Sequence, residues 1–181
     1  MNVALPNGNA PVRTSLDRAT FFNLVGEAAR VAEPGSAPVL IVIELTGLRD
    51  LALVNGPVSA LAEAAAGRIA GVLGETGYVS IQRSGRIALV AEDNGGAIDA
   101  LATALLASLV RPVVAEGVTL TPGAMLGIAR WSRDGVTVEE LFVAAHQAIC
   151  SETAAPIPGV GGHRPVRYVP SPLRSGDARA A

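Results

Sequence analysis

The sequence predicts an α/β domain, in which a sheet of four or five strands is flanked by helices. Apolar residues recur at three- and four-residue steps in several segments, as expected for helices with one buried face. Between these segments lie short apolar runs, which are typical of strands. Two such runs, 78–81 and 87–91, flank a Ser-Gly turn and predict an antiparallel hairpin. Helices that alternate with strands, together with one hairpin, indicate an α/β sheet with an antiparallel pair inside it.

The first half of the chain is expected to contain a helix, a buried strand and two further helices. Their expected ranges are 15–32, 39–45, 48–54 and 58–73. Ser15 is suited to be the N-cap of the first helix, which Pro34-Gly35 ends. The strand is apolar throughout except for Glu44, which indicates that both of its faces are covered. Asn55-Gly56-Pro57 separates the short helix from the long alanine-rich one.

The second half continues with the hairpin, a helix, a strand and a final helix. After the hairpin, the expected ranges are 97–110, 118–128 and 138–151. Asn94 and Thr137 are suited to cap the two helices. Pro122-Gly123 inside the expected strand indicates a bulge or an edge position, because proline cannot donate a hydrogen bond to a neighbouring strand.

Composition divides the chain into a folded middle and two loose ends. Residues 1–13 are polar and contain Asn, Gly and Pro, so this lead-in is expected to be disordered. The tail, 154–181, is rich in proline and glycine and is expected to be disordered as well. One domain, 14–153, lies between them.

Composition and charge also exclude several classes of function. The chain has 181 residues and a formal net charge of −2, so it offers no basic stripe for nucleic acid. The one cysteine, Cys150, excludes an internal disulfide and a cysteine metal cluster. The longest apolar stretch, 100–110, is far shorter than the roughly 20 residues of a membrane-spanning helix. With no export signal at the start, we expect a cytoplasmic protein that does not bind membranes.

Several motifs, in their order and spacing, resemble one known family. They are Thr14–Phe21 in the first helix, Ile43-Glu44-Leu45-Thr46-Gly47-Leu48-Arg49, Asn55-Gly56-Pro57, Met125-Leu126-Gly127-Ile128-Ala129 and Ala144–Cys150. The second of these falls where the family has Leu-Asp-Leu-Asp-Gly-Phe-Lys. Together they resemble the GGDEF domain, the diguanylate cyclase fold that joins two GTP molecules into cyclic di-GMP. The resemblance spans about 15–152 and implies a nucleotidyl-cyclase-like fold, with a ferredoxin-like core and a mostly antiparallel sheet of four to five strands.

The signature of that family is altered in this chain. The resemblance places Arg83-Ser84-Gly85-Arg86-Ile87 at the signature turn, so that Gly85 and Arg86 stand at its two acidic positions. On the first strand Glu44 replaces one family aspartate and remains a hard oxygen ligand, whereas Thr46 replaces the other with a neutral hydroxyl. Cyclase chemistry requires carboxylates that hold Mg²⁺ against triphosphate oxygens. No metal site, catalytic residue or cofactor is therefore expected.

The positions that would read the nucleotide differ as well. By the same resemblance Ala52 and Leu61 stand where the family has a guanine-reading Asn and an Asp. Apolar groups there would leave polar edges of guanine unpaired, at roughly 1–3 kcal/mol each. The family's Arg-x-x-Asp site for product feedback is replaced by Gly74-Glu75-Thr76-Gly77.

Two interpretations of the arginines around the turn remain open. Arg83 and Arg86, with Arg49 near a phosphate-contacting lysine of the family, would together meet an anion, and Glu44 would add a residual metal contact. Alternatively, these arginines are solvated side chains of a turn and a helix.

The sequence therefore predicts a degenerate GGDEF-like domain that acts as a catalytically inactive regulatory or protein-interaction module in bacterial cyclic-dinucleotide or related signalling. The low fraction of charged residues, 17%, favours a homodimer or a protein partner. The alternative is a receptor that binds GTP or cyclic di-GMP without turnover. An active diguanylate cyclase is the third hypothesis.

Overall fold

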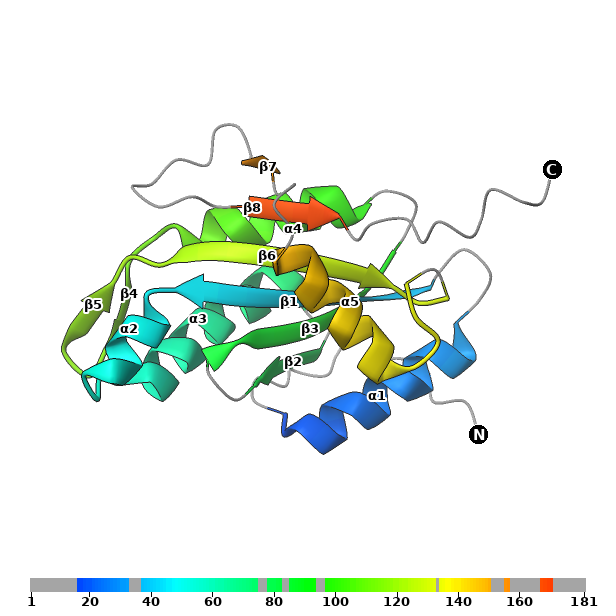
Figure 1. Cartoon of the computed structure of the whole chain (residues 1–181), viewed down its shortest axis with the longest axis horizontal. Helices are drawn as coiled ribbons and strands as arrows, with labels where there is room; N and C mark the ends of the chain where they lie inside the picture. The colour runs from blue at the N-terminus through cyan, green and yellow to red at the C-terminus, as the bar shows by residue number, and fades with distance from the viewer. Residues whose placement is uncertain are drawn as a thin grey trace.

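The computed structural model describes residues 16–32, 37–74, 78–82, 85–93, 97–132, 134–150, 155–156 and 167–170. Four neighbouring strands of the sheet pair in antiparallel fashion, in the order β2-β3-β1-β6, and β2 lies at one edge (Figure 1). Their bounds are Pro38–Thr46 for β1, Tyr78–Ile81 for β2, Ile87–Glu92 for β3 and Gly123–Arg130 for β6. The predicted fold class, an α/β domain with a mostly antiparallel sheet, is confirmed.

Strand β1 is central because both of its edges are paired. Val42 lies opposite Ala88 of β3 on one side and opposite Gly127 of β6 on the other. Side chains alternate across the strand, so Ile41 and Ile43 enter one core cluster while Leu40 and Val42 enter a second. Burial on both faces explains why this segment is apolar almost without interruption.

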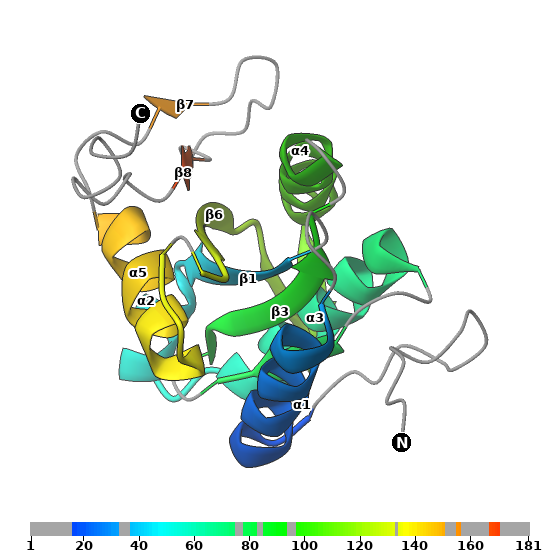
Figure 2. The same ribbon diagram turned by 90° about the vertical axis from the view of Figure 1, so that its right-hand side faces the viewer.

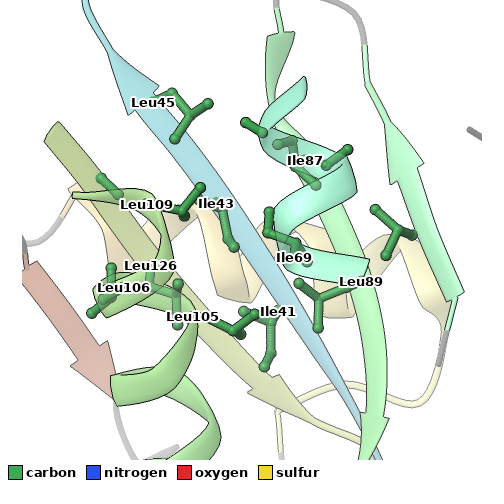
Figure 3. Close-up of a cluster of buried hydrophobic side chains, with 14 of the residues drawn as sticks. Ile41, Ile43, Leu45, Ile69, Ile87, Leu89, Leu105, Leu106, Leu109 and Leu126 are labelled. Carbon is green, nitrogen blue, oxygen red and sulfur yellow. The ribbon is translucent and has the colours of Figure 1, made fainter. Parts of the chain in front are cut away.

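Helices cover both faces of the sheet, as Figure 2 shows end-on. On one face lie α3 (Val58–Leu73) and α4 (Ala97–Leu109), whose apolar sides build the larger core cluster. Figure 3 shows the side chains of that cluster from both helices meeting those of β1, β3 and β6. On the other face lie α1 (Arg18–Val31) and α5 (Val138–Cys150), which contribute Phe21, Val25, Leu141 and Ala145 to the smaller cluster.

The helix caps agree in part with the sequence. Glu140 N–H donates to Thr137 Oγ1 at 3.2 Å, which confirms the predicted cap of α5. The cap of α1 is Asp17, since its carboxylate accepts the Thr20 N–H at 3.0 Å and the helix begins at Arg18. The expectation that Ser15 caps this helix is therefore wrong. Asn94, the expected cap of α4, lies outside the described residues.

The expectation of one strand over 118–128 is wrong. A hairpin of β4 (Val113–Ala115) and β5 (Val118–Leu120) forms a separate two-stranded sheet, and β6 begins afterwards. Glu116 and Gly117, with φ of 50° and 75°, make the tight turn of that hairpin. Pro122 lies between β5 and β6, where its missing N–H and fixed φ allow the chain to change sheets.

Two stretches of the tail are strands rather than the disordered chain expected there. Strand β8 (Arg167–Pro170) pairs in parallel with β6, and β7 (Ala155–Pro156) pairs with β8. The edge of β6 that faces away from β1 has backbone N–H and C=O groups, and an extended segment such as β8 can form hydrogen bonds with them. The domain limits predicted at residues 13 and 153 stay a prediction.

Helix α2 (Leu48–Leu53) follows β1 directly (Figure 1). None of the helices in the described part of the chain combines the length and apolar character needed to span a membrane.

Candidate functional site

The candidate site lies where the end of β1 meets the turn between β2 and β3. The last paired residues of β1 and β3 are Ile43 and Ile87, in antiparallel register. Continuing that register by one residue places Glu44 opposite Arg86. The signature turn thus reaches the strand end that carries the remaining acidic side chain.

Glu44 and Arg86 form an ion pair across these two strands. Arg86 Nε donates to Glu44 Oε2 at 3.0 Å. The two side chains are 31% and 37% exposed respectively, so water still screens the pair. Pairs of this exposure contribute about 0.2–1 kcal/mol to folding. The pair matters more for chemistry than for stability, because the Arg86 guanidinium neutralises the Glu44 carboxylate.

The residues around this pair do not fit a divalent metal ion. Thr46 lies two residues from Glu44 along β1 and therefore on the same face of the strand. Its Oγ1 is buried without a hydrogen-bond partner and carries no charge to attract Mg²⁺. Mg²⁺ is usually held by carboxylates together with waters and phosphates, and Glu44 is already paired with a guanidinium. Within the described ranges, no three His, Cys, Asp or Glu residues gather to hold a metal ion.

The signature turn is fixed by backbone hydrogen bonds and by one buried glycine. Gln82 N–H donates to Arg86 O at 2.7 Å, and Gly85 N–H donates to Gln82 O at 3.2 Å. Gly85 has a φ of +75°, and a Cβ built on it would lie 2.9 Å from Leu48 Cδ1. The turn is therefore closed on itself and pressed against α2. Arg83 and Ser84, also part of the predicted signature, lie outside the described residues.

The expected nucleotide-reading positions hold no polar side chain. Ala52 is exposed on α2, and Leu61 is 1% exposed because it belongs to the larger core cluster under α3. The backbone of Arg49 lies in α2, whereas its side chain is outside the described part of the chain. The anion contact proposed for Arg49 and Arg83 therefore stays a prediction.

The structure brings together two of the four residues singled out in the sequence, Glu44 and Arg86. Sequence reasoning treated them as separate contacts to a metal or an anion and missed that they pair with each other. The signal was present in the strand register, because the hairpin turn and the end of the central strand had to be adjacent if β3 paired with β1.

Comparison with known proteins identifies the fold. No family model matches the sequence, and no curated protein matches it. Among solved structures, the chain is similar to the GGDEF domain of YfiN (TpbB) from Pseudomonas aeruginosa, with 20% identity and a TM-score of 0.71 over 92% of this chain and 95% of that one. It is also similar to a sensory box/GGDEF family protein from Caulobacter crescentus, with 24% identity and a TM-score of 0.67 over 78% of this chain and 96% of that one.

A third similar structure is the diguanylate cyclase SiaD from Pseudomonas aeruginosa, solved in complex with its activator SiaC. Its identity is 16% and its TM-score 0.61, over 74% of this chain and 53% of that one. Identities at this level establish the shared architecture and leave the chemistry to each chain's own residues. The resemblance seen in the sequence is thus confirmed at the level of structure, and this chain has the fold of a GGDEF domain.

Proposed function

We propose that this chain is a catalytically inactive GGDEF-like module that acts by binding a protein or a second copy of itself in cyclic-dinucleotide signalling. The observation that carries the proposal is the ion pair between Arg86 and Glu44. A cation stands at the signature turn, and it neutralises the carboxylate that a metal ion would need.

The chemistry of phosphoryl transfer explains why this exchange matters. Such reactions depend on positioning and on divalent cations that neutralise the phosphate oxygens. Among the described residues of this site, a metal ion would have to displace the Arg86 guanidinium and then use the Thr46 hydroxyl or backbone carbonyls as its other protein ligands. The guanidinium would also remain nearby and repel the incoming ion. These terms all act against metal-dependent turnover.

Two exposed apolar side chains at the end of α2 support a role in binding. Leu53 and Val54, at the end of α2, are 81% and 72% exposed. Apolar side chains gathered at a surface favour contacts with other proteins. The similar protein SiaD was solved bound to its activator, a protein partner. Bacterial origin and a cytoplasmic location stay predictions.

The test is incubation of the full chain with GTP and Mg²⁺ or Mn²⁺, read for cyclic di-GMP by chromatography and for a shift in melting temperature. An active diguanylate cyclase treated in the same way is the positive control. We expect neither product nor shift. Formation of cyclic di-GMP by the purified chain, lost in the Glu44→Gln variant, would overturn the proposal.

A melting-temperature shift without product would instead support the receptor hypothesis. In that case the phosphates would compete with Glu44 for Arg86, and Arg86→Ala should abolish the shift with either GTP or cyclic di-GMP. A shift that survives Arg86→Ala would place the ligand elsewhere on the domain.

A further inference from the structure

A chain of hydrogen bonds joins the start of α1 to the signature turn. Leu16 N–H donates to Val79 O at 3.4 Å, so the residue before the α1 cap lies along the open edge of β2. Ser80 Oγ, next on that strand, donates to Leu16 O at 2.6 Å. The two residues are 64 positions apart in sequence, so this contact ties the entry of the domain to its sheet.

Ser80 also continues the chain toward the turn. Its Oγ accepts a hydrogen bond from Gln82 Nε2 at 2.9 Å. Gln82 is in turn the residue whose backbone N–H and C=O close the turn, through Arg86 O and Gly85 N–H. Arg86 then pairs with Glu44 on β1. A continuous path of polar contacts thus runs from Leu16 to the ion pair of the site.

Burial makes the middle of this path sensitive to its partners. Ser80 is 0% exposed and, with Asp134, is one of the two polar or charged residues that the described chain buries. A buried hydroxyl that loses its acceptor leaves an unsatisfied donor, which is unfavourable without water to replace the bond. Displacement of Leu16 should therefore favour a new orientation of the Ser80 hydroxyl, which in turn loosens the Gln82 side chain.

We propose that Ser80 and Gln82 are a mechanical link through which movement of the chain before α1 changes the order of the signature turn. The link goes beyond the proposed function, because it acts on the turn whether or not the domain turns over nucleotide. A partner bound to α1 would through this link change the surface around Arg86 and α2.

The experiment perturbs one end of the path and reads the other. Asp17→Ala removes the α1 cap next to Leu16, and native-state hydrogen exchange of the full chain reports protection of the Gly85 amide. We expect Gly85 to lose about five-fold in protection, as for one weakened hydrogen bond. In the Ser80→Ala background the same cap removal should change Gly85 by less than about two-fold, because the link is already cut.

Controls separate the link from general loosening. Thr137→Ala removes a cap of the same kind from α5 and should leave Gly85 unchanged. Gln82→Ala, at a partly exposed position, cuts the second step and should abolish the response as Ser80→Ala does, even if the serine variant fails to fold. An equal effect of Asp17→Ala in the wild-type and Gln82→Ala backgrounds would overturn the link. Such a result would leave the proposed lack of catalysis untouched.

Discussion

Replacing Gly85 with alanine tests how tightly the signature turn packs against α2. Two separate effects should lower the stability of the Gly85→Ala variant. Its φ of +75° lies in the left-handed region, which disfavours alanine by about 1–2 kcal/mol relative to glycine. Its new methyl group would also lie 2.9 Å from Leu48 Cδ1 and 3.3 Å from Val58 Cγ1. Leu48 Cδ1 is the end of a flexible side chain, so we add only about 1 kcal/mol, the low end for overpacking.

The total expected loss is thus about 2–3 kcal/mol in the free energy of unfolding, measured by urea denaturation. Gly117→Ala is the matched control, since that glycine has the same φ of +75°, but no atom beyond its chain neighbours lies within 4 Å of its added Cβ. The control should lose only the backbone term, about 1–2 kcal/mol. Equal losses in the two variants would refute the packing of the turn on α2.

Three further predictions concern the ion pair, the sheet and the first helix. Arg86→Glu replaces the ion pair with two neighbouring carboxylates, so it should destabilise the chain by about 1 kcal/mol. Mn²⁺ should raise the melting temperature of this variant and leave that of the wild type unchanged. A variant whose melting temperature does not respond to Mn²⁺ would contradict the proposed geometry with Glu44. Gly127→Ala would place a Cβ 1.9 Å from Ala145 O, a backbone atom that cannot move aside. We expect the free energy of unfolding, measured by urea denaturation, to fall by about 3 kcal/mol or more, and a fall below about 1 kcal/mol would refute the close approach of α5 to β6. Hydrogen bonds from Thr20 lower the pKa of Asp17, so the stabilising effect of its carboxylate is present above the usual carboxyl range and is lost as pH falls through the lowered value. In thermal melts at falling pH, the wild type should therefore lose more stability than Asp17→Asn, and identical acid profiles would contradict this.

Much of the fold was readable because local patterns and burial agree. The apolar run of β1 has both edges paired and both faces covered, and such a segment has few other ways to satisfy its backbone. The hairpin of β2 and β3 followed from its turn and its flanking runs. Apolar residues at three- and four-residue spacing predicted the bounds of α3 and α5 almost to the residue.

Elements that depend on distant partners were harder to predict. The separation of β5 from β6 depends on which sheet each segment joins. Pro122 by itself fits a bulge within one strand just as well as a break between two strands. Strand β8 forms because β6 offers an edge, a condition that the composition of the tail does not reveal. The partnership of Glu44 and Arg86 required the strand order, which local propensity does not encode.

Calorimetric titration of Mg²⁺–GTP into the full chain shows whether Glu44 is free to hold a metal-bound nucleotide. We expect no saturable heat, because the one carboxylate at the end of β1 is held by Arg86. A saturable, Mg²⁺-dependent isotherm that disappears in Glu44→Gln would show that this carboxylate serves a metal-bound nucleotide, and would contradict this expectation.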